Sequence, residues 1–272
     1  MEMHLPDLSE KIAVITGGGG AICGAMAEAL AQQGVRVAIW DLSDKAAETI
    51  AERITSKGGN AVGLNCDVMD KAAINAALQA TLDEYRGVDI LINGAGGSRK
   101  EATTSPELSF FDILPEEIRR TIDLNYLSAV LPSQSVGRVF ADQGHGVILN
   151  IASIAGLLPL SRSLAYSNGK AAVINFTQWL AVHMAKEYSP KIRVNALAPG
   201  FVLTDQNRFL LVDESGEFTE RGQHVIGEVP LRRYGEPHDM AGTALWLVSD
   251  AAAFVTGAVI PVDGGYMAYS GV

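Results

Sequence analysis

The sequence predicts an α/β protein: a single Rossmann-type, doubly wound domain over residues 1–272, with about seven parallel strands and helices on both faces. Three observations support this prediction. Short apolar runs alternate with helix-like stretches along the whole chain, and the runs are apolar on both faces, as strands of a covered parallel sheet are. A glycine-rich turn also joins the first run to a helix. A chain of 272 residues that is 48% hydrophobic can bury a full core.

The elements follow one another without a repeat, linker or low-complexity tract. Ser43 and Asp70 are plausible caps at the start of two helices. The expected strands are Ile12–Thr16, Val35–Trp40, Ala61–Asn65, Asp89–Ile92, Gly146–Ile151, Ile192–Leu197 and Val259–Val262. The expected helices lie near 22–33, 43–57, 70–86, 115–140, 163–188 and 236–249. The long irregular stretches 94–114 and 200–235 follow strands, so we expect them to hold a substrate.

Composition excludes several classes of protein. A formal net charge of −10 argues against nucleic-acid binding, which depends on Lys and Arg at phosphates. The two cysteines, Cys23 and Cys66, form neither a C-x-x-C nor a metal-binding spacing, which favours a reduced, cytoplasmic compartment. The uncharged stretch Ile12–Ala27 contains four consecutive glycines and falls short of the roughly 20 residues of a membrane span. Scattered histidines predict no required metal.

A dinucleotide site is predicted after the first strand. The turn Gly17–Gly20 and the following Ala21 and Ile22 can present backbone amides and a helix N-terminus to a pyrophosphate, with Gly17, Gly19 and Gly20 leaving the approach open. The strict G-x-G-x-x-G spacing is not met, and a turn without a ligand is the alternative interpretation.

Asp41 ends the second strand, where an acidic residue accepts hydrogen bonds from the adenosine ribose. Its carboxylate would repel a 2′-phosphate, so we predict NAD in preference to NADP. A solvated or capping acid is the alternative. Five residues at the ends of the next two strands are expected near the adenine and ribose, although such features are more often simple turns. They are Asp67 with Val68, and Asn93 with Gly94 and Ala95.

Ser153, Tyr166 and Lys170 form the most informative group in the chain. Tyr166 and Lys170 are four residues apart, so on a helix their side chains lie about one turn from each other. A nearby ammonium favours a phenolate and lowers the tyrosine pKa, which suits a group that exchanges protons with a substrate. Ser153 could hold the substrate oxygen. A chance Y-x-x-x-K pair is the alternative, but its position after an apolar strand argues against it.

The helix over residues 171–185 is apolar nearly all round. One face can cover the sheet, and the other needs a second cover. We expect a homo-oligomer, with a tetramer favoured, while coverage by the chain's own loops is the alternative.

In its motifs the chain resembles the short-chain dehydrogenase/reductase family along essentially its whole length. The departures are Ala21 and Cys23 where the family usually has glycine, and Gly94 where a second Asn is common. The resemblance implies that Asn125 helps to hold a water in a proton relay and that Lys170 also binds the nicotinamide ribose. It also implies cofactor contacts at Pro199, Gly200, Val202 and Thr204, with Thr204 bonding the nicotinamide amide. The motifs are Thr16-Gly17, Asn93-Gly94-Ala95-Gly96, Asn125, Ser153, Tyr166-x-x-x-Lys170 and Pro199-Gly200.

More narrowly, the chain is similar to the D-mannonate oxidoreductase (fructuronate reductase) subgroup, through strings such as Gln178–His183 and Thr204–Arg208. This implies an NAD-dependent enzyme that interconverts a sugar-acid alcohol and its ketone. A sugar acid needs a local cation for its carboxylate, and Arg162 is the first candidate and Arg208 the second. The alternatives are the same chemistry on gluconate, a polyol or a 3-oxoacyl group, or a non-catalytic sensor of NAD(H).

Overall fold

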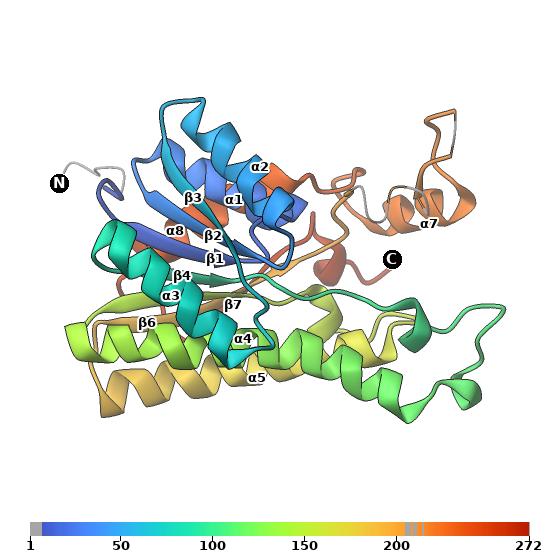
Figure 1. The fold of residues 1–272 in the computed structure, drawn as a ribbon. Coiled ribbons are helices and arrows are strands. Elements are labelled where there is room, and N and C mark those ends of the chain that lie inside the picture. Colours follow the sequence, from blue (N-terminus) through green and yellow to red (C-terminus); the bar gives the residue numbers. More distant parts are fainter. Residues whose placement is uncertain (1–6, 205–207, 209–210, 214, 272) are drawn as a thin grey trace.

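The computed structural model describes residues 7–204, 208, 211–213 and 215–271 (Figure 1). Seven strands form one parallel sheet in the order β3-β2-β1-β4-β5-β6-β7. Their order reverses between β1 and β4, which is where this kind of sheet opens a crevice for a ligand. The strands are β1 Ile12–Thr16, β2 Arg36–Asp41, β3 Asn60–Asn65, β4 Ile90–Asn93, β5 Gly146–Ile151, β6 Ile192–Pro199 and β7 Val259–Val262.

Helices cover both faces of the sheet, which confirms the predicted doubly wound architecture. In Figure 1, α1, α2 and α8 lie on one side, and α3, α4 and α5 lie on the other. The described helices are α1 Ala21–Gln32, α2 Asp44–Thr55, α3 Lys71–Tyr85, α4 Pro115–Gln143, α5 Leu164–Glu187, α7 Glu220–Glu228 and α8 Ala241–Val248. Ser43 caps α2 by accepting from Ala46 N, and Asp70 caps α3 by accepting from Ala72 N, as the sequence predicts.

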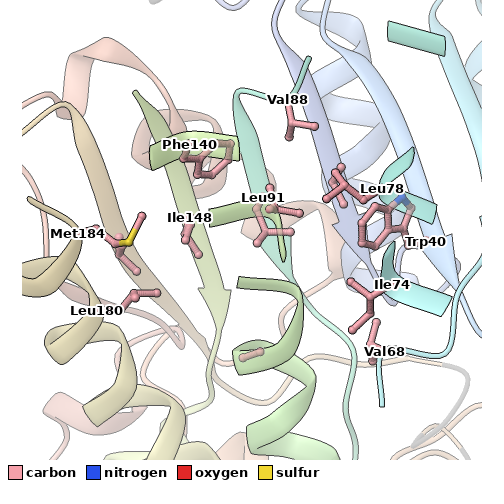
Figure 2. Packing of buried hydrophobic residues seen from close by; sticks show 14 of the residues in the cluster. Trp40, Val68, Ile74, Leu78, Val88, Leu91, Phe140, Ile148, Leu180 and Met184 are labelled. Atoms are coloured by element: carbon pink, nitrogen blue, oxygen red, sulfur yellow. The ribbon is translucent and has the colours of Figure 1, made fainter. Parts of the chain in front are cut away.

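Two hydrophobic clusters fix the helices to the sheet. Figure 2 shows part of the cluster beneath α3, α4 and α5, in which Trp40 of β2 is fully buried. Its indole Nε1 donates to Thr81 Oγ1 at 3.1 Å, so its polar atom is satisfied inside the core. Loss of a buried ring of this size costs about 3–5 kcal/mol. The sheet is therefore a rigid platform for the loops at its carboxyl edge.

The loops after β4 and β6 both extend from the same edge of the sheet, on the right in Figure 1. The stretch 94–114 contains two 3-10 turns, Lys100–Ala102 and Phe110–Asp112. The stretch 200–235 is not irregular throughout, because it contains α7, which the sequence did not predict. This short helix carries two glycines and depends on a local cluster around Leu211, Val212 and Tyr234. The expected helix 236–249 is divided into a 3-10 turn at Pro237–Met240 and α8.

None of the helices in the described part of the chain combines the length and the apolarity that crossing a bilayer requires.

Candidate active site

The turn after β1 brings backbone amides to the carboxyl edge of the sheet. Gly17 has a φ of 63°, a left-handed conformation that favours glycine, and a β-carbon there would lie 2.8 Å from Ala95 Cα. Gly20 is the N-cap of α1 and makes no side-chain cap, and no acidic residue stands in the first turn. The first amides of α1 are therefore available to an anion, although Ala21 replaces a glycine.

Asp41 stands at the end of β2 and is tied to this turn. Its Oδ2 accepts from Gly19 N at 3.0 Å, and its Oδ1 accepts from Ser43 N at 2.9 Å. A β-carbon at Gly19 would lie 2.9 Å from Asp41 Oδ2 and 2.6 Å from Ala46 Cβ, so only glycine fits this approach. The carboxylate is half-buried and held by two amides, which leaves its outer lone pairs for a ribose.

The residues after β3 and β4 differ in what they offer a ligand. Asp67 is exposed and accepts from Met69 N at 2.9 Å, whereas Val68 is buried. The side chain of Asn93 faces the core instead of the ligand edge: its Nδ2 donates to Ser133 Oγ at 2.9 Å and to Asn150 Oδ1 at 2.8 Å. Only the backbone of Asn93 is therefore left to contact a cofactor. The strand pattern does not reveal this, because β4 is buried on both faces.

Gly94 and Ala95 are bonded to the end of β1. The hydroxyl of Thr16 accepts from Gly94 N at 3.1 Å and from Ala95 N at 3.4 Å, and Ser128 Oγ donates to Ala95 O at 2.9 Å. Thr16 and Ser128 were absent from the predicted site residues. A threonine that ends an apolar run directly before the glycine turn is the sequence signal that could have identified Thr16.

Ser153, Tyr166 and Lys170 meet at the carboxyl end of β5. Ser153 follows the strand, and its hydroxyl accepts from Ala155 N at 3.1 Å. Tyr166 and Lys170 lie one turn apart near the start of α5, with Lys170 Nζ 5.8 Å from the centroid of the Tyr166 ring. Lys170 Nζ donates to Ile151 O at 2.8 Å, which holds the amine beneath the site. The structure thus brings the three predicted groups together.

Burial is the largest influence on the pKa values of Tyr166 and Lys170. It raises the pKa of the Tyr166 phenol above its ordinary value, and a hydrogen bond with Ser153 opposes that rise. Burial lowers the pKa of the Lys170 amine to about 8. The net direction at Tyr166 is opposite to the lowering expected from the sequence, because spacing along a helix reports proximity to Lys170 but not the extent of burial.

Asn125 connects α4 to the loop after β4. Its Nδ2 donates to Gly97 O and to Thr121 O, both at 2.8 Å, and its Oδ1 accepts from Gly97 N at 3.1 Å. An amide oxygen can accept a second hydrogen bond, so Oδ1 has capacity for a water. A β-carbon at Gly96 would lie 2.8 Å from Asn125 Oδ1 and 3.6 Å from Lys170 Nζ, which places this loop against the catalytic group.

The segment after β6 lies at the same edge. Gly200 N donates to Val262 O at 3.0 Å, and a β-carbon at Gly200 would lie 2.6 Å from Asp263 Cα. Pro199 ends β6, Val202 is buried and bridges to Gly235, and Thr204 is half-buried. The glycine lets the chain pass close to β7 and turn over the site.

The two candidate arginines are placed less firmly. Arg162 precedes α5 with a φ of 70°, and its carbonyl accepts from Thr104 N at 3.0 Å. Its guanidinium is exposed and makes no hydrogen bond or ion pair within the described part of the chain. Arg208 is also exposed, and its amide donates to Thr204 O at 2.9 Å. Neither guanidinium is fixed beside Tyr166, so their roles remain predictions.

The chain matches the family model described as enoyl-(acyl carrier protein) reductase over residues 19–267. It is 41% identical to the uncharacterized oxidoreductase UxuB of Bacillus subtilis, over 98% of both chains. A solved structure from Haemophilus influenza, provisionally described as a D-mannonate oxidoreductase with bound NAD, superposes with a TM-score of 0.92, 38% identity and 98% coverage of both chains. Another, provisionally described as a gluconate dehydrogenase from Agrobacterium tumefaciens, gives a TM-score of 0.86 with 29% identity, over 98% of this chain and all of that one.

The fold, the glycine turn and the Ser153, Tyr166 and Lys170 group define an oxidoreductase that uses a nicotinamide dinucleotide. The chain belongs to the short-chain dehydrogenase/reductase family, as its motifs predicted, and it acts on a CH–OH group.

Proposed function

We propose that this enzyme interconverts a sugar-acid alcohol and its ketone with NAD, and that D-mannonate and D-fructuronate are its substrate pair. The observation that carries the chemistry is the meeting of Ser153, Tyr166 and Lys170 at the carboxyl edge of β5. The likeness to the Haemophilus protein with bound NAD supports the choice of substrate.

NAD, when bound, would accept a hydride from the carbinol carbon, and NADH would return it to the ketone. In oxidation, the Tyr166 phenolate takes the hydroxyl proton, and in reduction the phenol returns that proton to the ketone oxygen. Ser153 orients the reacting oxygen through its hydroxyl. Burial raises the pKa of Tyr166 in this structure, and the hydrogen bond with Ser153 opposes that rise. In this proposal the nearby lysine amine and the positive charge of oxidised nicotinamide favour the phenolate further.

Lys170 also binds the nicotinamide ribose in this proposal, and Asn125 holds a water that relays the proton to solvent. Lys170 is anchored by Ile151 O, and Asn125 by Gly97, so both groups are fixed before a ligand arrives. Preorganised groups of this kind do not need to rearrange during the reaction.

In this proposal NAD is preferred to NADP because Asp41 is held at the end of β2, where the adenosine ribose is expected. Two backbone amides hold its carboxylate, so it cannot swing away from a 2′-phosphate. The remaining proposed cofactor contacts come from backbone at the strand ends and from the segment after β6. They are Gly17, Gly19, Gly20, Ala21, Ile22, Asp67, Val68, Asn93, Gly94, Ala95, Pro199, Gly200, Val202 and Thr204.

We propose that the sugar-acid carboxylate is received by Arg162, with Arg208 as the second candidate. We also propose that the loops 94–114 and 200–235 hold the substrate and that residues 1–272 form a single domain. Arg162 lies four residues before Tyr166, just ahead of α5, and its carbonyl is already bonded to the first of these loops. A guanidinium can bind a carboxylate through two parallel hydrogen bonds.

We also propose a cytoplasmic homo-oligomer, a tetramer being favoured. The outer face of α5 exposes Trp179 and Val182, and Tyr188 follows it, with exposed fractions of 57%, 58% and 51%. A groove of ≈ 690 Å³ runs between α4 and α5 beside them. Large contiguous apolar surfaces mark association sites. The two free, buried cysteines agree with a reducing compartment.

A panel of sugar acids and polyols, followed by NADH absorbance, tests the proposed substrate. We expect fructuronate to oxidise NADH and mannonate to reduce NAD, with NADP much weaker. Turnover confined to neutral polyols would contradict the sugar-acid assignment and leave the oxidoreductase class intact.

A further inference from the structure

Gly94, the residue after β4, faces the sulfur of Cys23 on α1. A β-carbon at position 94 would overlap Cys23 Sγ, while it would lie 3.5 Å from Cys23 Cβ and 3.0 Å from Thr16 O. The sulfur is therefore the main obstacle to any side chain at position 94. Cys23 is itself buried, with 4% of its surface exposed, so it cannot turn away into solvent.

This contact lies where two loops of the dinucleotide site interlock. The amide of Gly94 donates to Thr16 O at 3.2 Å and to Thr16 Oγ1 at 3.1 Å. On the other side, Gly17 approaches Ala95 so closely that a β-carbon would lie 2.8 Å from Ala95 Cα. The glycine turn and the loop of residues 94–97 are thus held against each other at two points, and Cys23 with Gly94 forms one of them.

The loop of residues 94–97 extends from this contact to the catalytic group. Ala95 O accepts from Ser128, and Gly97 is bonded through both backbone atoms to the Asn125 amide. Gly96 lies against Asn125 and Lys170. A displacement at position 94 is therefore passed along four residues to the place where the nicotinamide ribose is expected.

We propose that Cys23 and Gly94 are a matched pair of positioning residues that sets the spacing between the glycine turn and the loop of residues 94–97, and thereby the fit of the dinucleotide. The sulfur takes the space that a side chain at position 94 would otherwise occupy. Burial raises the pKa of Cys23 to about 12, so the thiol stays neutral and acts through its volume. The inference rests on the proposed dinucleotide site and not on the choice of substrate.

The test compares Gly94→Ala, Cys23→Ala and the double variant by NADH fluorescence titration. Gly94→Ala forces the loop away from α1, and we expect its Kd for NADH to rise about tenfold, or about 1.4 kcal/mol. In the double variant the added methyl meets Cβ at an ordinary distance, and the 3.0 Å approach to Thr16 O needs only a small shift. The Kd of the double variant should return to within about threefold of the Kd of Cys23→Ala. Such a recovery would show that positions 23 and 94 are energetically coupled.

Two matched controls separate positioning from a general loss of packing. Gly242→Ala places a methyl in open space on α8 and should leave NADH binding unchanged. Cys66→Ala removes the other buried thiol, which is not among the atoms nearest to position 94. Combined with Gly94→Ala, it should leave the Kd for NADH raised. Circular dichroism at the titration temperature establishes that each variant is folded.

Two results would overturn the inference: an unchanged Kd for NADH in Gly94→Ala, whether or not its unfolding midpoint falls, or a double variant that binds NADH no better than Gly94→Ala. If Gly94→Ala does not fold, recovery of both folding and NADH binding by Cys23→Ala supports the pairing, and failure to recover refutes it. Absence of NADH binding by the wild-type protein would instead refute the proposed function.

Discussion

Replacement of Asp41 by Asn is the clearest test of how the enzyme chooses its cofactor. The carboxylate is fixed by Gly19 N and Ser43 N at 3.0 and 2.9 Å, so its charge stays where the adenosine ribose is expected. Each unit of like charge about 4 Å away costs about 1 kcal/mol in bulk water, which is the lower limit for this half-buried position. A 2′-phosphate carries nearly two such charges, so the repulsion amounts to at least about 2 kcal/mol, or at least about 30-fold in preference.

Asp41→Asn also weakens the glycine turn, because an amide cannot accept from both backbone groups. We expect kcat/KM for NAD to fall about tenfold, in line with the roughly 1–3 kcal/mol cost of an unsatisfied polar group. The loosened turn affects both cofactors equally, so the ratio of kcat/KM for NAD to that for NADP reports the charge together with the ribose hydrogen bond and should fall at least about 30-fold.

Initial rates of NADH and NADPH formation at several cofactor concentrations give this ratio. Asp44→Asn removes an exposed carboxylate from the first turn of α2 and serves as the matched control. A ratio that stays at the wild-type value in Asp41→Asn, or that falls equally in Asp44→Asn, would refute the assignment of Asp41.

Three further predictions concern substrate, pH and assembly. Arg162→Ala should raise KM for a sugar acid at least about tenfold more than KM for a neutral polyol, and equal effects in steady-state assays would dismiss a carboxylate contact. Because burial lowers the Lys170 pKa to about 8, from 10.5, the unfolded chain binds more protons between these values and stability should rise with pH across that window. Urea unfolding of Lys170→Met should lack this rise, and an identical pH dependence in both proteins would contradict it. Trp179→Lys places a charge on the exposed face of α5 and should reduce the oligomer mass in light scattering, with an unchanged mass arguing for another interface.

Much of the fold was predictable because hydrophobic pattern and turn residues determine it locally. The bounds of β1, β5 and β7 agree with the apolar runs, and both predicted caps form. Strand β6 continues to Pro199 because Ala198 and Pro199 lie in register with Pro261 and Val262 of β7, a pairing distant in sequence. Helix α7 was missed because it is short and carries two glycines, and because its Val225 and Ile226 pack against Leu211, Val212 and Tyr234, which lie on either side of it in the sequence.

Some features of the candidate site could likewise be predicted from the sequence, and others could not. Spacing was enough to place Tyr166 and Lys170 on one face of a helix, and the strand ends were enough to place Asp41. Spacing could not give the burial that raises the pKa of Tyr166, nor the inward direction of the Asn93 side chain. The contact between Cys23 and Gly94 also depends on the packing of α1 against the loop after β4, which no local pattern encodes.

The central claim is that the Tyr166 hydroxyl gives and takes the substrate proton, and Tyr166→Phe tests it most directly. We predict that kcat falls about 10²- to 10⁴-fold, the usual contribution of a proton-transfer group, while the Kd for NADH stays close to that of the wild type. Tyr85→Phe removes a hydroxyl that bonds Asn60 on the opposite side of β1 from the catalytic group and should retain turnover. A Tyr166→Phe enzyme that keeps a tenth or more of wild-type kcat would contradict the account.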